Sequence, residues 1–284
     1  MYFCICVILA LNYFLLKKTE QTCTCSQKFI LFSKKVKLKR LIHNRQGRGE
    51  SIYQAKVIVN MKNTLYYIIR LMARKLIYFV RHGETENNAK NIRQGPEGHL
   101  SEKGRAQALE TAHRFPKHKG RPQVIIASPY ERTKETAEII AKELGMKVKY
   151  SDLLVERRNP TEIIGHEGGD LDVRQIVDRI DKSYHSDDLR FSDEENFTDL
   201  KARAKKLLKY ISWRPEERIM MVTHGIFLKM VAAYMTYGDA LTASQYNTLS
   251  YFNPIENASM AICSYQSHWF TKDEWKIIVW NDLA

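Results

Sequence analysis

The sequence predicts an α/β protein, a three-layer αβα sandwich with a mostly parallel sheet, plus an N-terminal extension. Two short apolar runs, 76–80 and 219–223, have the length and composition of buried parallel strands. Helical patterns alternate with such runs, and this order is typical of a parallel sheet covered on both faces. A basic, partly apolar stretch without sustained periodicity precedes the first strand. We therefore expect an extension over 1–73 and a main domain over 74–284.

The distribution of charge supports this division. The chain of 284 residues has 45 Lys and Arg against 32 Asp and Glu, a net charge of +13. Residues 1–75 hold 15 basic and 2 acidic residues, which leaves 45 − 15 = 30 basic and 32 − 2 = 30 acidic residues in 76–284. Because the main domain is balanced, its charge gives no reason to expect a nucleic-acid partner. Its one cysteine, Cys263, excludes a disulfide framework and fits a cytoplasmic enzyme.

The extension allows several interpretations. Residues 2–16 are apolar except for Asn12, but this run is shorter than the roughly 20 residues that span a bilayer. Any membrane contact or anchor is expected only there. The basic run 34–40 is a solvated arm or a contact for nucleic acid or acidic lipid. Alternatively, the extension is poorly ordered or its start is mis-assigned, and translation begins at Met61 or Met72.

The first half of the main domain begins with the strand over 76–80. The elements expected after it are, in order, a loop over 85–98, a helix over 101–115, a strand over 124–127, a helix over 129–144 and an edge strand over 147–150. Ser101 has the residue type of a helix N-cap. Ser128 followed by Pro129 and Glu131 forms a capping-box pattern with proline at the first helical position. Gly145 is expected to end that second helix.

The second half of the main domain begins with its least regular segment. Residues 151–195 combine Arg, Pro, Gly and acidic stretches, and we expect them to form a cap inserted over the sheet. The elements expected after this cap are, in order, a helix over 197–211, a strand over 219–223, a helix over 226–237 and strands over 258–265 and 275–280.

Basic residues stand at the ends of the predicted strands. Arg81 and His82 follow the first strand directly, and His224 follows the strand over 219–223. Arg132 lies in the first turn of the helix after the second strand. The carboxyl ends of parallel neighbours share one rim of a sheet, where ligands bind in open α/β folds. Two arginines and two histidines at such a rim suit an oxyanion, and phosphate best.

The motifs at these strand ends occur in a specific order. They are Arg81-His82-Gly83-Glu84-Thr85 with Asn88, Gln94-Gly95, Leu100-Ser101-Glu102-Lys103-Gly104, Ser128-Pro129 with Arg132-Thr133 and Thr136-Ala137, Leu154-Val155-Glu156-Arg157, and Val222-Thr223-His224-Gly225. In this order the chain, over roughly 74–284, resembles the histidine phosphatase superfamily, also called the phosphoglycerate mutase-like family.

The resemblance implies a covalent phosphohistidine mechanism without metal or cofactor. His82 would attack phosphorus in line, and Glu156 would protonate the leaving oxygen and then activate water. Glu162 and Glu167 are nearby alternatives for that carboxylate. The three equatorial phosphoryl oxygens would be held by Arg81, Arg132 and His224. The positions implied in phosphate or substrate binding are Asn88, Gln94, Gly95 and Gly225.

The expected activity is hydrolysis of a phosphate monoester. The predicted strand over 275–280 stands where the mutases of the family have a flexible tail, which favours a hydrolase. A phosphoglycerate mutase-type transfer and an inactive phospholigand-binding module are the alternatives. Many relatives follow the acid with an aromatic-glycine pair, whereas this chain has 157–161 there. The resemblance therefore implies a small phosphorylated metabolite or phosphoester as substrate, without identifying it.

Overall fold

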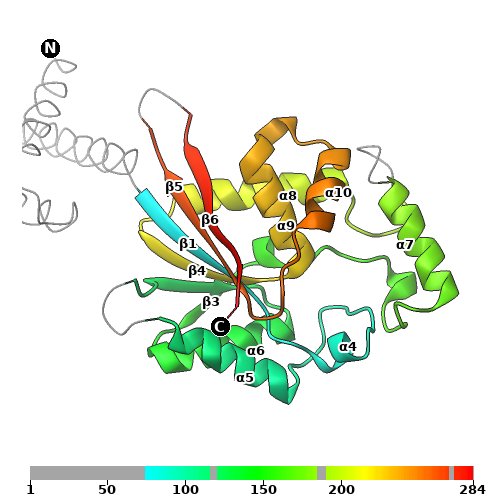
Figure 1. Cartoon of the computed structure of the whole chain (residues 1–284), viewed down its shortest axis with the longest axis horizontal. Helices are drawn as coiled ribbons and strands as arrows, with labels where there is room; N and C mark the ends of the chain where they lie inside the picture. Colours follow the sequence, from blue (N-terminus) through cyan, green and yellow to red (C-terminus); the bar gives the residue numbers. More distant parts are fainter. Residues whose placement is uncertain (1–73, 116–119, 184–189, 269–271, 284) are drawn as a thin grey trace, which may run out of the picture. The chain divides into compact units, whose positions relative to one another are not determined.

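The computed structural model describes residues 74–115, 120–183, 190–268 and 272–283, and the described residues form one sheet in the order β3-β2-β4-β1-β5-β6 (Figure 1). The strands are β1 (Arg74–Arg81), β2 (Val124–Ala127), β3 (Val148–Tyr150), β4 (Arg218–Thr223), β5 (Met260–Gln266) and β6 (Glu274–Asp282). Strands β1 to β4 pair in parallel, whereas β5 and β6 are antiparallel to their neighbours. The predicted α/β class with a mostly parallel sheet is confirmed.

Helices connect these strands and cover both faces of the sheet (Figure 1). The α-helices of the described residues are α4 (Glu86–Ala89), α5 (Glu102–His113), α6 (Glu131–Leu144), α7 (Leu171–Ser183), α8 (Phe197–Ser212), α9 (Gly225–Tyr237) and α10 (Ala243–Phe252). Short 3-10 turns cover Asp152–Leu154, Thr161–Ile163 and Gly238–Ala240. Helices α5 and α6 pack together below the sheet in the view of Figure 1, and α8, α9 and α10 lie on its other side.

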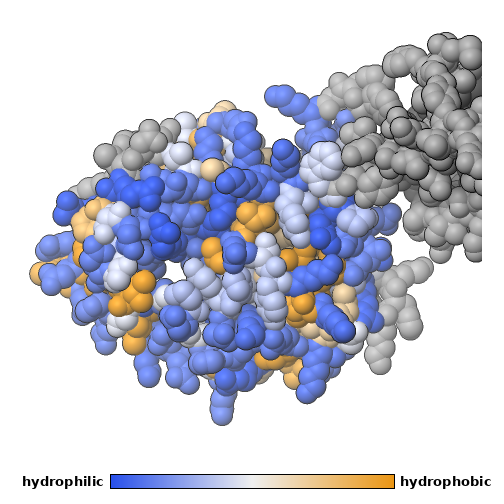
Figure 2. Space-filling view, turned by 180° about the vertical axis from the view of Figure 1, so that it is seen from behind, coloured by the Kyte–Doolittle hydropathy of each residue, from blue (hydrophilic) through white to orange (hydrophobic). Residues whose placement is uncertain are grey.

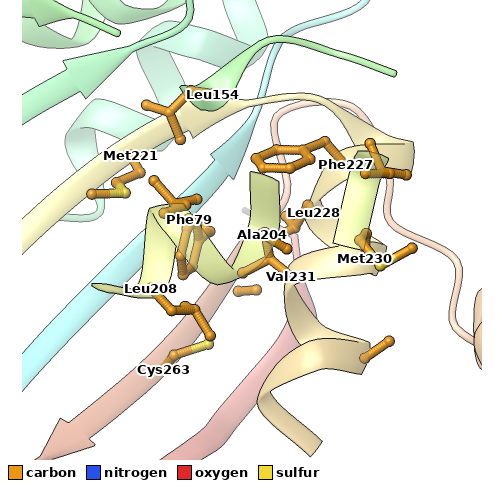
Figure 3. Close-up of a cluster of buried hydrophobic side chains, with 14 of the residues drawn as sticks. Phe79, Leu154, Ala204, Leu208, Met221, Phe227, Leu228, Met230, Val231 and Cys263 are labelled. Atoms are coloured by element: carbon orange, nitrogen blue, oxygen red, sulfur yellow. The ribbon is translucent and has the colours of Figure 1, made fainter. Parts of the chain in front are cut away.

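Strand β1 shows how the sheet separates two hydrophobic cores. Side chains alternate between the two faces of a strand, so Ile77 and Phe79 join the core on the side of α8 and α9. Tyr78 and Val80 join the core on the side of α5 and α6. Figure 3 shows Phe79 among side chains of the first core, including Val231. Strand β1 is thus buried on both faces, as its unbroken apolar run predicts.

The start of α6 differs from the predicted capping box. The helix begins at Glu131 with Tyr130 as its N-cap, and no side chain caps it. Ser128 instead extends the parallel pairing of β2 with β4, because its N–H donates to the carbonyl of Val222 at 3.0 Å. This strand pairing overrides the local capping preference. At the other end, Gly145 adopts a left-handed conformation with φ 59° and ends the helix as predicted.

Three α-helices of the described residues have no counterpart in the predicted elements. The shortest, α4, lies within the expected loop over 85–98. Helix α7 lies within the irregular segment 151–195 and buries Val173 and Ile180. Helix α10 begins at a capping box formed by Thr242 and Gln245. Residues 243–252 mix apolar and polar side chains without a clear helical stripe, which is why periodicity did not indicate α10.

No helix among the described residues is both long enough and apolar enough to cross a membrane. The predictions for residues 1–73, including the apolar segment 2–16, concern residues outside the described part of the chain. On the face shown in Figure 2, hydrophilic residues predominate and hydrophobic residues occur in small separate groups.

Candidate active site

The parallel pairing of β1 with β4 brings the two His-Gly motifs together. Arg81 is in register with Thr223, so the next residues, His82 and His224, lie side by side. The backbone N–H of His82 donates to the carbonyl of Thr223 at 3.0 Å. The centroids of the two imidazole rings are 5.3 Å apart, and both side chains are buried. The predicted convergence of these strand ends is present.

His82 has the protonation state that a nucleophile needs. Its Nδ1 lies 2.8 Å from the carbonyl oxygen of Gly83, which only accepts hydrogen bonds. The proton of the neutral ring is therefore on Nδ1, and Nε2 carries a free lone pair. Burial lowers the pKa of His82 well below its usual range, and the charges of Arg132 and Arg81 lower it further. The ring is consequently neutral at physiological pH.

The loop that carries His82 is fixed by close packing against α5. The N–H of Gly83 donates to Thr136 Oγ1 at 3.1 Å. A Cβ atom added to Gly83 would lie 2.4 Å from the carbonyl oxygen of Gly104, and one added to Gly104 would lie 2.0 Å from that of Glu84. Two glycines therefore allow the backbones to touch, which explains Gly83 by packing rather than by approach to a ligand.

Two arginines and His224 each have an unpaired side-chain nitrogen near His82. Arg132 donates from Nη1 to the carbonyl of Gly95 at 2.8 Å, and Arg81 from Nη1 to that of Ile255 at 2.6 Å. The Nε atoms of both arginines and Nδ1 of His224 are buried and have no hydrogen-bond partner among the described residues. Buried polar nitrogens without partners are unfavourable unless a ligand satisfies them, and Nδ1 of the neutral His224 ring is a donor when it carries the ring proton. We call these three nitrogens the open donors.

Burial and the proximity of these basic groups shift their pKa values. Burial lowers the pKa of Arg132, and the charge of Arg81 contributes to this decrease. Burial also lowers the pKa of His224 well below its usual range. Nearby positive charge lowers it further, and the contributing residues are, in decreasing order, Arg132, His82, Arg203 and Arg81. Two arginines and two histidines thus share one buried region, where the guanidinium charges would attract an anion.

Glu156 lies at the edge of this basic cluster, at the N-terminus of α9. Its carboxylate accepts hydrogen bonds from the N–H of Phe227 at 2.9 Å, of Ile226 at 3.3 Å and of Arg157 at 2.9 Å. A helix N-terminus favours such a negative charge. The Glu156 charge also raises the pKa values of Arg81 and Arg132, which places it near both guanidinium groups.

The other predicted binding residues have structural contacts. Asn88 Oδ1 accepts the N–H of Thr85 at 3.3 Å in the capping box of α4, and Gln94 Oε1 accepts the Thr85 hydroxyl at 3.0 Å. Gly95 orients Arg132 through its carbonyl. A Cβ atom on Gly225 would lie 3.3 Å from Arg81 Nε. Gly95 thus contacts Arg132 directly, Gly225 leaves little room for a side chain beside Arg81, and phosphate or substrate binding by all four residues stays a prediction.

Three further residues contact the site without having been predicted. Ser128 Oγ lies 2.9 Å from His224 Nε2. The ring of Tyr130 packs edge-on against His224 with centroids 5.2 Å apart, and the Arg132 guanidinium carbon is 5.3 Å from that ring's centroid. Arg203 donates to the carbonyl of Val155 at 2.6 Å, beside Glu156. Ser128 has the residue type of a helix cap, which concealed its contact with His224.

An open cleft of ≈ 460 Å³ adjoins the basic cluster. Its lining is Tyr130, Val155, Glu156, Arg158, Arg190, Glu195, Asp199 and Arg203. Two of its arginines form ion pairs within the lining, Arg190 with Asp199 and Arg203 with Glu195. Arg158 donates from Nε to the carbonyl of Asp193. The cleft is therefore polar and rich in hydrogen-bonding groups.

Comparison with known proteins places this geometry in a family. The profile of the histidine phosphatase superfamily (branch 1) matches residues 77–282. A probable phosphoglycerate mutase GpmB from Salmonella arizonae is 33% identical over 161 residues, 54% of this chain and 70% of the relative. The GpmB of Shigella boydii is 28% identical over 217 residues, 73% of this chain and 93% of the relative.

Solved structures share the fold. A mycobacterial glucosyl-3-phosphoglycerate phosphatase superposes with a TM-score of 0.59 at 24% identity and covers 73% of this chain and 99% of its own. A phosphoserine phosphatase from Entamoeba histolytica superposes with a TM-score of 0.55 at 22% identity, covering 73% and 96%. At these identities the likeness is one of fold.

Proposed function

Because this chain belongs to the histidine phosphatase superfamily, we propose that it is a phosphomonoester hydrolase that acts through a phosphohistidine at His82. Members of the superfamily are phosphatases or phosphoglycerate mutase-like enzymes. The single observation that supports this assignment best is the set of open donors on Arg81, Arg132 and His224. They surround an uncharged imidazole that has an available lone pair.

The proposed reaction has two steps. In the first, His82 Nε2 attacks phosphorus, the bond to the ester oxygen breaks, and Glu156 supplies the proton that the leaving alcohol takes. In the second, Glu156 removes a proton from water, whose oxygen attacks the phosphohistidine and releases inorganic phosphate and the free imidazole. The open donors hold the three equatorial phosphoryl oxygens throughout, where negative charge develops.

Fixed guanidinium groups supply the positive charge for this reaction. Arg81 and Arg132 stand beside His82 and need no recruitment from solution, so charge stabilisation is preorganised. We therefore expect turnover to be independent of divalent cations. Activity that survives exhaustive chelation by EDTA would agree with this expectation, and activity restored only by an added metal ion would contradict it.

The cleft beside Glu156 favours a small substrate with a polar leaving group. Its lining offers arginines and carboxylates, and Val155 and the Tyr130 ring are the apolar exceptions. The fold neighbours named as phosphatases of glucosyl-3-phosphoglycerate and of phosphoserine agree with a small phosphorylated metabolite. Nucleic acid is not an expected partner of this domain, because its basic and acidic residues balance.

A phosphoglycerate mutase is the second candidate function. The curated relatives named GpmB, described as probable phosphoglycerate mutases, support it, and the Shigella boydii protein is covered over 93% of its length. A mutase must keep the phosphoryl group for return to a second hydroxyl, so it excludes water. The open cleft beside the proposed acid favours access of water and therefore hydrolysis.

The test compares the wild type with His82→Ala and with His99→Ala. His99 is an exposed histidine paired with Glu135, and its replacement is the matched control. We expect the wild type and the control to release phosphate from an aryl phosphate and to take up acid-labile phosphate from it. His82→Ala should lose both properties, because no other group carries the attacking lone pair.

Each candidate function has its own outcome in this test. Interconversion of phosphoglycerates without net phosphate release would support the mutase. Tight binding of inorganic phosphate with neither reaction would support an inactive binding module. Labelling that persists in His82→Ala would show that another residue is the nucleophile.

A further inference from the structure

A buried hydroxyl lies against the second histidine of the site. Ser128 and His224 are both fully buried, and Ser128 Oγ lies 2.9 Å from His224 Nε2. Nδ1 of the same ring is one of the open donors. Tyr130 packs edge-on against the ring, so its orientation is constrained as well. The nitrogen that carries the single ring proton then determines whether Nδ1 of His224 offers a bound anion an N–H donor or a lone pair.

The donors and acceptors around Ser128 Oγ indicate which nitrogen of His224 carries that proton. A serine hydroxyl has one hydrogen to donate and two lone pairs that accept. The N–H of Tyr130 donates to Ser128 Oγ at 3.3 Å. If His224 Nε2–H donated to the same oxygen, the buried hydroxyl hydrogen would have no acceptor among the described residues, which is costly. If the hydroxyl donates to Nε2, the hydroxyl hydrogen and Nε2 are both satisfied, and the ring proton is on Nδ1, where it is the one donor left for an anion.

We propose that Ser128 is a positioning residue that holds His224 in the Nδ1–H tautomer, so that Nδ1–H donates to a phosphoryl oxygen. The inference rests on the proposed phosphoryl transfer at His82. Without the hydroxyl, the neutral ring also populates the Nε2–H tautomer, which turns the Nδ1 lone pair toward the anionic oxygen. A donor would thereby become a repulsive contact in the transition state.

The neutral state of the ring makes the tautomer relevant. Burial and the nearby charge of Arg132 lower the pKa of His224, so the anion-free protein holds the ring with one proton. An imidazolium would donate from both nitrogens and would need no partner to choose between them. The hydroxyl of Ser128 supplies that choice at the second histidine, as the Gly83 carbonyl does at the first.

Nitrogen-15 NMR of the histidine-labelled full chain at neutral pH measures the tautomer directly. We assign His224 by through-bond correlation to its own backbone. In the wild type we expect a protonated Nδ1 and an unprotonated, hydrogen-bonded Nε2. In Ser128→Ala we expect a mixture of both tautomers. A wild-type ring protonated on Nε2 would overturn the inference, and that measurement requires no variant to fold.

A matched variant distinguishes a specific effect on the His224 tautomer from a general disruption of the turn that contains Ser128. Thr133 Oγ1 donates to the carbonyls of Ser128 and Tyr130, at 3.0 and 2.7 Å, and among the described residues these are its hydrogen bonds. Thr133→Val removes a buried hydroxyl from the same turn, and we expect it to leave the His224 tautomer unchanged. A tautomer mixture in Thr133→Val equal to that in Ser128→Ala would refute a specific role for Ser128.

Two further readouts connect the tautomer to the site. In Ser128→Ala we expect kcat for an aryl phosphate to fall by about 10–100-fold, the range seen when an orienting partner is removed, and kcat/KM to fall further. We also expect weaker binding of inorganic phosphate. Wild-type kcat in Ser128→Ala would overturn the inference. A wild type without any turnover would instead refute the proposed function, while the NMR result would still decide the tautomer.

Discussion

At the scale of single residues, the surroundings of Glu156 determine what its carboxylate can do. Three backbone N–H groups donate to it, two of them from the first turn of α9. Arg203 donates to the neighbouring carbonyl of Val155 and pairs with Glu195, which holds the segment in place. The carboxylate is therefore fixed at the mouth of the cleft rather than mobile in solvent.

The variant Glu156→Gln tests its proposed role as acid and base. A glutamine keeps one accepting oxygen for the α9 N–H groups but cannot supply a proton to the leaving oxygen. We expect kcat/KM for an alkyl phosphate to fall by about 10²–10⁴-fold, whereas the value for an activated aryl phosphate should change far less.

The control for this prediction is Glu162→Gln, which changes the neighbouring carboxylate that accepts from Ser192 Oγ. We expect it to leave both substrates unaffected. Equal slowing of alkyl and aryl substrates by Glu156→Gln would show that a different residue is the acid. A selective loss of alkyl phosphate turnover in Glu162→Gln would identify that residue.

At the scale of elements, helix α5 supports the loop that carries His82, the proposed nucleophile. Gly83 and Gly104 allow the loop backbone to touch the helix, and the cap of Ser101 on the N–H of Gly104 fixes the helix start at the same place. Strand β1 delivers His82, but α5 determines how far its loop can move. We therefore expect the proposed catalysis to depend on a contact that includes none of the proposed catalytic side chains.

The variant Gly104→Ala tests this support. Its Cβ would lie 2.0 Å from the backbone oxygen of Glu84, so the loop or the helix must shift. We expect a loss of about 1–3 kcal/mol in the free energy of unfolding, measured with urea, and a lower kcat. Gly169→Ala is the control, because nothing lies within 4 Å of its added Cβ. Equal stability of the two variants would contradict the close contact.

At the scale of the whole molecule, two buried neutral histidines couple stability to pH. Burial lowers the pKa values of His82 and His224 well below the value of about 6.5 of an unfolded chain. Below pH 6.5 the unfolded state therefore binds protons that the folded state does not. The stability contributed by these groups is complete above that pH and is lost as the pH falls toward the folded-state pKa values.

Urea unfolding of the full chain at several pH values in phosphate-free buffer measures this coupling. Each such histidine adds a slope of about 1.4 kcal/mol per pH unit below pH 6.5. We expect His224→Asn to remove roughly one histidine's share of the wild-type slope. Identical slopes in wild type and His224→Asn would contradict a neutral buried ring.

The sheet and the meeting of the two histidines could be predicted from the sequence. The unbroken apolar runs 76–80 and 219–223 indicate strands buried on both faces. Each of these two runs is followed directly by a basic residue, Arg81 or His224. Parallel neighbours share a rim, so His82 and His224 were expected together and are together. These properties depend on local composition and on general rules of α/β folds.

Contacts between distant segments were decided by the tertiary structure alone. The pairing of β2 with β4 turned Ser128 from an expected helix cap into a partner of His224, 96 residues further on. Two of the three hydrogen bonds that Glu156 accepts come from a helix about 70 residues away. Helix α10 forms although its own periodicity is weak, because it buries Ala243 and Tyr246 against the core.

The sequence by itself determined the residue types available for chemistry and the strands that end at them. Only the tertiary structure decided which nitrogen of each imidazole is free, since that depends on a carbonyl at His82 and on a hydroxyl at His224. The physical reason is the range of the interactions. Hydrophobic patterning acts along a few neighbouring residues, whereas hydrogen bonds and charges act between whichever groups the fold brings within a few ångströms.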